Sequence, residues 1–174
     1  MKRHEKAALI LLALGTVFAC AQAPTEDQSM AHETQSRVYW VDPSTGLMWP
    51  TKDNGKDVSF KKAIKYCHNL RLAGYSDWKL ANTAELQGIF DRTVEAPGLA
   101  GYKKKLRAFT WHIKGNLFLT GDPWSSNFIV DDRGHYSGYA YYFDFNEGRP
   151  NDDPSGWPYS SSGMRALCVR SSAK

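Results

Sequence analysis

Three cysteines, Cys20, Cys67 and Cys168, are the residues of this chain whose chemistry is best defined by their surroundings. A positively charged start is followed by a short apolar run, Ala7–Phe18, which ends directly before Cys20. The run is shorter than the ~20 apolar residues that cross a bilayer. It is therefore typical of a signal for export that is cleaved from the mature chain.

The first cysteine follows the sequence VFA at 17–19, which resembles the cleavage site of a bacterial lipoprotein. Val17 and Ala19 fit the small, apolar pattern, whereas Phe18 is bulkier than usual at its position. This predicts lipidation of Cys20. The alternative is that Ala19-Cys20-Ala21 forms an A-x-A site for ordinary signal peptidase, which would remove Cys20 with the signal.

The other two cysteines are predicted to pair in either case, because an exported chain folds in an oxidising compartment. Cys67 lies on the apolar stripe of a predicted helix, and Cys168 lies in the last predicted strand. Such a bridge closes a loop of about 100 residues, which is worth ~4.7 kcal/mol in the chain-entropy description.

No sequence motif favours catalysis. The sequence lacks G-x-S-x-G, H-E-x-x-H, a P-loop and C-x-x-C. His68, His112 and His135 have no spacing signature with Asp or Ser, and we interpret them as surface or core residues. We therefore expect no catalytic residues and no enzyme.

One dense cluster of positive charge is the best candidate for a polyanion contact. It consists of Lys103, Lys104, Lys105 and Arg107, which we expect in a loop next to Tyr102. Clustered ammonium groups attract sulfate or phosphate by screened Coulomb forces, and a guanidinium adds bidentate geometry. Lys61, Lys62 and Lys65, on the polar face of the first predicted helix, are expected to extend the cluster. The alternative is an ordinary solvated loop and helix face.

Calcium is the one cofactor for which the sequence offers candidate ligands. Asn151, Asp152 and Asp153, with Asp131 and Asp132, supply carboxylate and amide oxygens in predicted loops. Calcium takes six to eight oxygen ligands, and the sequence shows no EF-hand spacing. We therefore expect neither a metal site nor another cofactor, and keep these residues as calcium candidates only.

Length and charge define the organisation of the chain. Residues 1–19 are the predicted signal, residues 20–36 a lipid-anchored tether without an apolar period, and residues 37–174 one domain. Without the signal, 19 basic and 17 acidic residues remain, a charge of +2. This balance argues against nucleic acid as a partner.

The first half of the domain shows clear element signals. Strands are predicted at 37–41 and 47–49, joined by a turn at 42–46. A helix begins at Ser59, carries an apolar stripe and is expected to end at Gly74. Its stripe consists of Phe60, Ala63, Ile64, Cys67 and Leu70. A strand at 78–80 precedes a second helix, for which Asn82 and Glu85 form a capping box.

The second half is expected to be rich in loops. Gly and Pro interrupt residues 91–138, with strands possible only at 109–113 and 116–119. Aromatic residues alternate over 139–145, which predicts a strand with one aromatic face. A further loop at 148–163 leads to the last strand, 165–170. The predicted class is α+β, with two helices against short antiparallel strands, long loops and one disulfide.

Several sequence blocks occur in an order that resembles a known family. They are TGLMW at 45–49, AIKYC at 63–67 with Leu70, AGYSDWKL at 73–80, EL at 85–86, WSS at 124–126 and RALCVR at 165–170. The chain looks like a member of the Lcl C-terminal domain family, a domain of unknown function named after a collagen-like bacterial adhesin. Ala81 departs from the family pattern, which usually has Pro there, and this concerns only the start of the second helix.

The resemblance implies a fold similar to the C-type lectin-like and sulfatase-modifying-factor group, in which a disulfide often joins the first helix to the last strand. It also implies extracellular binding, with sulfated glycans as the ligand attributed to the adhesin. It implies no ligand residues, because the shared blocks are mostly Gly, Trp, Leu and Cys.

Together these patterns predict an exported envelope or surface lipoprotein, in the outer membrane since Ala21 follows the lipidated cysteine. We expect a non-catalytic domain that binds a glycan or an envelope protein, with the membrane contacted through the lipid alone. An oligomer is compatible with this function, because a trimer would raise the avidity of weak contacts to a polyanion. The alternatives are a structural partner-binding subunit of an envelope assembly and, with less support, an enzyme related to sulfatase-modifying factors.

Overall fold

The computed structural model of the chain describes residues 38–102, 105–151 and 162–173. Strands from both ends of the domain meet in its first sheet, which has the order β1-β2-β10-β3. These strands are β1 (Tyr39–Val41), β2 (Leu47–Pro50), β3 (Lys79–Leu80) and β10 (Cys168–Ser171). All pairs in this sheet are antiparallel. The last strand, β10, lies between β2 and β3.

The turn between β1 and β2 forms as predicted. Asp42 accepts hydrogen bonds from the Ser44 amide at 3.0 Å and from the Thr45 hydroxyl at 2.7 Å, and Gly46 supplies a positive φ of 66°. An aspartate that bonds to its own turn favours this geometry over an extended chain. The first residues of β2, Leu47 and Met48, then pair with β10.

The first helix, α2 (Phe60–Asn69), is confirmed, with three corrections at its edges. Phe60, Ala63 and Cys67 are buried as predicted, but Ile64 is 41% exposed because it lies at the margin of the stripe. Ser59 occupies the N-cap position without a side-chain cap hydrogen bond. The helix ends before Leu70, and Gly74 belongs to the turn that follows.

The capping box of α3 (Thr83–Gly88) is confirmed. The Asn82 side chain accepts from the Glu85 amide at 2.8 Å, and the Glu85 carboxylate accepts from the Asn82 amide at 2.8 Å. Two of the backbone N–H groups at the start of the helix are satisfied in this way. Leu86 and Ile89 are then fully buried.

The loop-rich interpretation of residues 91–138 is wrong, because strands cover most of this segment. They are β4 (Ala96–Tyr102), β5 (Lys105–Trp111) and β6 (Asp122–Val130), with the 3-10 turn η1 (Lys114–Asn116) between the last two. Strands β4 and β5 pair only with each other. Apart from a hydrogen bond from the Leu99 amide to the Leu119 carbonyl at 2.8 Å, β4 is an edge strand, where Pro97 and Gly98 are tolerated despite their poor strand preference.

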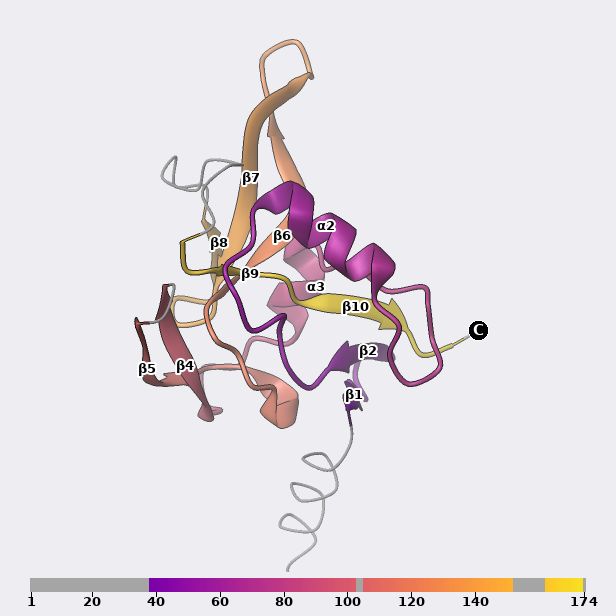
Figure 1. The fold of residues 1–174 in the computed structure, drawn as a ribbon, viewed down its shortest axis with the longest axis vertical. Coiled ribbons are helices and arrows are strands. Elements are labelled where there is room, and N and C mark those ends of the chain that lie inside the picture. Colours follow the sequence, from indigo (N-terminus) through magenta and orange to yellow (C-terminus); the bar gives the residue numbers. More distant parts are fainter. Residues whose placement is uncertain (1–37, 103–104, 152–161, 174) are drawn as a thin grey trace, which may run out of the picture.

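The third sheet has the order β8-β7-β6-β9. Its further strands are β7 (Tyr136–Asp144), β8 (Arg149–Asn151) and β9 (Met164–Arg165). The pair β6–β9 is parallel and the others are antiparallel. In Figure 1 the β6–β7 hairpin extends beyond the rest of the fold, at the opposite end from β1. The predicted last strand is divided, because β9 joins the third sheet and β10 the first.

The core consists of two hydrophobic clusters that lie on opposite faces of the strands. On β2, Met48 belongs to one cluster and Trp49 to the other, and on β10 the same holds for Cys168 and Val169. Since successive side chains of a strand point to opposite faces, both faces of the first sheet are covered. Strand β7 also faces both clusters, so its aromatic side, which buries Phe143, is not its only buried side.

A disulfide joins Cys67 of α2 to Cys168 of β10, as predicted, with a Cα–Cα distance of 5.4 Å. Figure 1 shows α2 crossing in front of β10. The bridge thus fixes the first helix on the last strand across 101 residues of sequence. The class is α+β, with most of the regular structure in strands.

Candidate functional site

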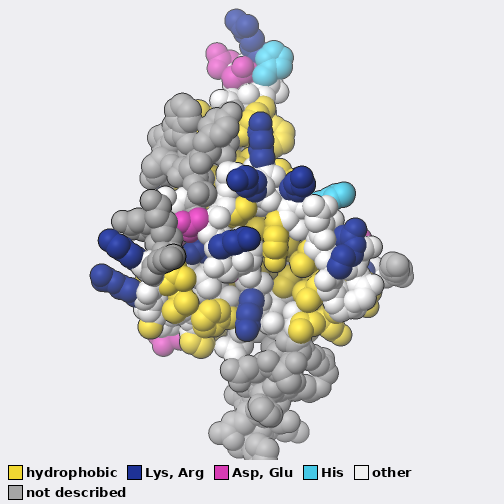
Figure 2. All heavy atoms as spheres, in the orientation of Figure 1, with side chains coloured by type: hydrophobic (Ala, Val, Ile, Leu, Met, Phe, Trp, Pro, Cys, Tyr) yellow, Lys and Arg dark blue, Asp and Glu magenta, His cyan; other side chains and the backbone are white. Residues whose placement is uncertain are grey.

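Seven exposed cationic side chains define a surface that we call the basic face. They are Lys52, Lys56, Lys61, Lys62, Lys65, Lys105 and Arg107. Within the described residues none of the seven forms an ion pair, whereas Lys79 is paired with Glu85 at 2.6 Å. Figure 2 shows Lys and Arg side chains over the side of the molecule that carries α2 and at its edge near β5, with few Asp or Glu among them.

The helix α2 contributes three of these cations because its inward stripe is narrow. Phe60, Ala63 and Cys67 are buried, which leaves Lys61, Lys62 and Lys65 exposed. No acidic residue lies in the first turn of the helix. The lysines therefore present positive charge to solvent without a neighbouring carboxylate on α2.

The predicted polyanion cluster lies partly in a strand and not in a loop. Lys105 and Arg107 belong to β5, where they pair with Tyr102 and Ala100 of β4. Both are exposed, and their spacing of two residues places them on one face of the strand. Lys103 and Lys104 lie outside the described residues. The strand gives Lys105 and Arg107 a fixed spacing that a loop would not provide.

A pocket of about 340 Å³ lies between α2, the end of β2 and β10. Its polar lining consists of Thr51, Lys52, Asp53 and Tyr66. Its apolar lining consists of Val38, Pro50, Leu70, Leu72, Ala166 and Cys168. Val38 is 53% exposed and Tyr66 is 36% exposed, so both lie at its margin.

The aspartate of the pocket is held by the fold. Asp53 is buried, and its carboxylate accepts hydrogen bonds from the Thr120 amide, from the Thr120 hydroxyl at 2.9 Å and from the Gly55 amide at 2.7 Å. Burial raises the pKa of Asp53 against these hydrogen bonds. Burial, with the nearby charge of Asp53, also raises the pKa of the Tyr66 hydroxyl. Tyr66 therefore faces the pocket as a neutral phenol at physiological pH.

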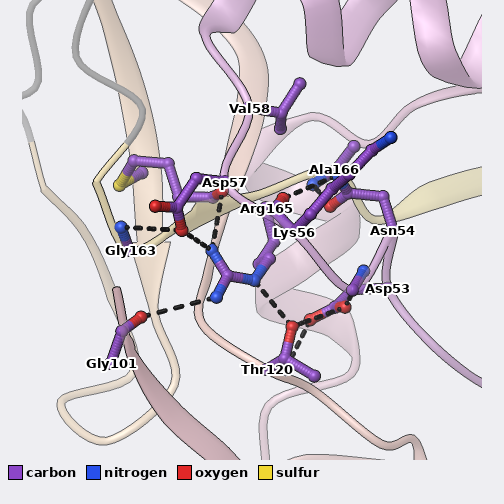
Figure 3. Close-up of polar contacts among 12 residues, drawn as sticks. Asp53, Asn54, Lys56, Asp57, Val58, Gly101, Thr120, Gly163, Arg165 and Ala166 are labelled. Carbon is purple, nitrogen blue, oxygen red and sulfur yellow. Dashed lines mark hydrogen bonds and ion pairs between the residues drawn. The ribbon is translucent and has the colours of Figure 1, made fainter. Parts of the chain in front are cut away.

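Behind the pocket, a buried arginine joins three segments (Figure 3). Arg165 donates from Nε to the Thr120 hydroxyl at 2.6 Å and from Nη1 to Asp57 at 2.6 Å. Its side chain is 1% exposed. A charge buried to this degree needs a partner and further hydrogen bonds, and the Gly101 carbonyl and the Met164 carbonyl supply them. The network holds the segment 53–57 against β9 and against Thr120, which precedes β6.

A second buried arginine, Arg170, is paired with an exposed aspartate, Asp77, near β3. Arg170 makes two hydrogen bonds to Asp77, at 2.8 and 3.1 Å, and its guanidinium lies 3.8 Å from the centroid of the Tyr75 ring. The hydrogen bonds to Asp77 raise the pKa of Arg170 further. Bidentate pairing and stacking are both typical of Arg. Arg170 is thus occupied within the fold and is not part of the basic face.

An acidic pair lies near Arg165 on the third sheet. Burial, together with the negative charge of Asp144, raises the pKa of Asp122 to about 7, although Arg165 opposes this shift. Asp144 accepts hydrogen bonds from the amides of Asn146 and Glu147 in the following turn. The pair therefore makes the charge of this part of the fold dependent on pH near neutrality.

Among the described residues, the calcium candidates Asp131 and Asn151 do not come together. Asp131 accepts from the amides of Arg133 and His135 within its own turn, at the end of the β6–β7 hairpin. Asn151 pairs with Tyr142, six residues along β7 from Tyr136, a separation of roughly 20 Å. Asp152 and Asp153 lie outside the described residues. In the described part of the chain no group of three His, Cys, Asp or Glu could hold a metal ion.

The histidines lie in three different surroundings. The ring of His112 bonds to the Val94 carbonyl at 2.9 Å, His68 lies beside Asn69 at the end of α2, and His135 lies near Asp131 in the hairpin turn. None of these contacts joins a histidine to a serine or a cysteine. Cys67 and Cys168 are both engaged in the disulfide. We therefore assign no catalytic group among them.

The predicted signal, Cys20 and the tether lie outside the described residues. No helix in the described ranges is long and apolar enough to cross a bilayer.

Sequence reasoning found the lysines of α2 and β5 but missed the pocket, with Lys52 and Tyr66. The available signal was the spacing of Lys62 and Tyr66 along α2. Side chains four residues apart share one face of a helix, and this face flanks the apolar stripe. The position of Lys52 depends on the path of the chain after β2, which no local pattern encodes.

Comparison with known proteins identifies the family of the domain. No curated protein and no solved structure matches it. The family model described as the Lcl C-terminal domain matches residues 38–170. The matched range includes both bridged cysteines, the pocket and every described cation of the basic face. The chain belongs to the Lcl C-terminal domain family.

Proposed function

We propose that this chain is an exported envelope lipoprotein whose single domain binds an anionic glycan without catalysis. The observation that carries the proposal is the basic face, seven exposed cations without an acidic partner among the described residues. Unpaired surface charge is a poor stabiliser of a fold but attracts a polyanion. Sulfated polysaccharide is the ligand class of the adhesin after which the family is named, and it fits this charge.

The proposal includes a likeness to the C-type lectin-like and sulfatase-modifying-factor group. Its support is the bridge between α2 and β10, because a disulfide from the first helix to the last strand is frequent in that group. Enzymes of the sulfatase-modifying type use reactive thiols, whereas Cys67 and Cys168 are bonded to each other. A binding role therefore has more support than a catalytic one.

The remaining parts of the proposal concern the N-terminus. Cys20 is the proposed lipid attachment site, residues 20–36 the tether, and residues 37–174 the domain. The outer membrane is the proposed location because Ala21 follows the lipidated cysteine. The tether would allow the domain to reach ligands at a distance from the membrane.

A second candidate function is a structural subunit of an envelope assembly, favoured by an apolar patch. Phe128, Val130 and Tyr136 are 51%, 51% and 41% exposed near the end of the β6–β7 hairpin. The rings of Phe128 and Tyr136 meet edge to face at 5.4 Å. Exposed apolar patches of this kind are frequent in protein interfaces, and the hairpin extends away from the fold (Figure 1).

The proposed function is tested by charge-neutralised variants of the full chain and their affinity for heparin. One variant replaces Lys103, Lys104, Lys105 and Arg107 by Ser, and another replaces Lys61, Lys62 and Lys65 by Ser. Each exposed charge contact is worth ~0.2–1 kcal/mol. Three or four such contacts sum to ~0.6–4 kcal/mol, so each variant should bind at least about threefold more weakly.

The matched control replaces Lys79, Arg92 and Arg149 by Ser, because these exposed cations are already bonded to acceptors of their own. Lys79 bonds to Glu85, Arg149 to Glu147, and Arg92 to the Glu147 carbonyl. The control loses three charges but should keep its affinity within about twofold. Equal losses in all three variants would indicate net charge and not the basic face, and failure of the wild type to bind would favour the assembly subunit.

A further inference from the structure

The pocket beneath α2 has the size of a site for one small ring. Its volume of about 340 Å³ lies at the lower end of the ~300–1,000 Å³ typical of small-molecule sites. It is lined from four separate segments, namely Val38 before β1, residues 50–53 at and after the end of β2, α2 with the following turn, and the segment 166–168. The disulfide at Cys168 and the Asp53–Thr120 hydrogen bonds fix two of these walls.

The lining of the pocket combines an apolar wall with a few polar groups. Pro50, Leu70 and Leu72 offer C–H and methyl surface, and Tyr66 adds an aromatic ring at the margin. Within the described residues the Tyr66 hydroxyl makes no hydrogen bond, so it is available to a ligand hydroxyl. An apolar wall with few polar groups suits a ring that has one C–H face and polar substituents at its edge.

The charge at the pocket is positive where a ligand would enter. Lys52 is exposed and lines the pocket without an ion pair in the described part of the chain. Lys62 lies one helical turn before Tyr66, so the two share a face of α2, and Leu70 follows directly after the helix. Asp53 is the acidic group of the lining and its charge acts on Tyr66, but Arg165 acts on it in turn and its oxygens accept hydrogen bonds from Thr120 and Gly55.

We propose that this pocket accepts one anionic pyranose residue of the glycan that the basic face binds. The ring packs with its C–H face against Tyr66 and the apolar wall, and its sulfate or carboxylate lies at Lys52, with Lys62 beside it. The inference rests on the proposed function and adds to it, because the lysines of the basic face recognise charge alone. The pocket selects for a ring that carries the charge, and it therefore confers selectivity among polyanions.

The test compares a short probe with a long one on the full chain. The short probe is a sulfated disaccharide prepared from heparin, and the long probe is intact heparin. The variant Val38→Trp fills the mouth of the pocket, and Lys52→Ala removes its cation. Both positions are exposed, so the fold should tolerate the changes. Gln87→Trp and Lys79→Ala make the same changes at exposed positions of α3 and β3.

Lys52→Ala should bind the disaccharide about tenfold more weakly, the effect of one lost charge-assisted contact. Val38→Trp should weaken disaccharide binding at least as much, because its indole takes the place of the sugar ring. The two controls should bind the disaccharide within about twofold of the wild type. Intact heparin should still bind Val38→Trp, because the other lysines of the basic face are retained. Disaccharide binding that is unchanged in both pocket variants would overturn the pocket assignment alone. Failure of the wild type to bind even intact heparin would overturn the proposed function with it.

Discussion

The two buried arginines show how single residues hold this fold. Arg165 and Arg170 follow each other closely in the sequence, yet one bonds to Asp57 and the other to Asp77. A buried charge without its partner costs several kcal/mol, so each pair fixes the path of a distant segment. The sequence predicts neither pair, because acid and base are separated by about a hundred residues and no local pattern links them.

Asp122 should make the stability of the domain depend on pH. Its pKa of about 7 in the folded state exceeds the ordinary value of 3.8. The folded chain therefore binds this proton more tightly, and the free energy of unfolding should fall as pH rises from about 4 to about 7. A rise of about three pKa units corresponds to a fall of as much as ~4 kcal/mol in the free energy of unfolding. The measurement is chemical denaturation of the full chain at several pH values.

The variant Asp122→Asn should lack most of this fall, because its amide does not titrate. It should gain stability relative to the wild type as pH rises through this window. Asp132→Asn, which neutralises an exposed carboxyl in the hairpin turn, serves as the control. Parallel pH profiles of the wild type and Asp122→Asn would show that Asp122 titrates in its ordinary range.

Among the elements, the two helices and the β1–β2 hairpin have strong local signals and were predicted, whereas the hairpin β4–β5 was not. Asn82 and Glu85 form the predicted capping box, and α2 follows its apolar spacing. The hairpin β4–β5 was missed because Pro97, Gly98 and Gly101 are poor strand formers. Gly98 is required there by packing, since a side chain at this position would meet the Trp111 ring and the Leu119 carbonyl.

The bridge between α2 and β10 should be a large contribution to the stability of the domain. Replacing Cys67 and Cys168 together by Ala should lower the free energy of unfolding by ~2–5 kcal/mol, because the unfolded chain is released from a loop of 101 residues. Denaturation of the full chain by urea measures the change. Treatment of the wild type with a reductant should reproduce it, whereas two free thiols in the oxidised, denatured chain would contradict the bridge.

At the scale of the molecule, the arrangement of the ends suits a tethered binding domain. Strand β1, where the described chain begins, lies at one end, and the β6–β7 hairpin lies at the other (Figure 1). The basic face lies along the side between them (Figure 2). A chain anchored through residues before β1 would thus keep both the basic face and the apolar patch of the hairpin accessible.

The anchor itself is tested by Cys20→Ser. We expect the wild type in the membrane fraction and the variant in the soluble fraction, because a thioether-linked lipid cannot form on Ser. Fractionation of cells that express either full chain provides the measurement. The intact mass of the wild type is the second measurement. A mass that corresponds to an unmodified chain beginning after Ala21 would contradict lipidation of Cys20.

The candidate site was predicted in part. The sequence identified cations of α2 and β5 as parts of one polyanion contact, but it placed Lys105 and Arg107 in a loop and not in a strand. The pocket could not be predicted, since its walls come from segments that meet only in the folded chain. Its formation depends on the disulfide and on the Asp53–Thr120 contact, both of which join residues far apart in the sequence.

The central claim is that the basic face binds a polyanion, and the most direct measurement is the affinity of the wild-type full chain for heparin as a function of salt. Raising the salt from about 0.1 M to about 1 M shortens the Debye length from ~10 to ~3 Å. Binding through exposed lysines should therefore be measurable at 0.1 M and largely lost at 1 M, while uncharged dextran of similar length should not bind at either. No heparin binding at 0.1 M, or binding that 1 M salt leaves unchanged, would contradict the claim.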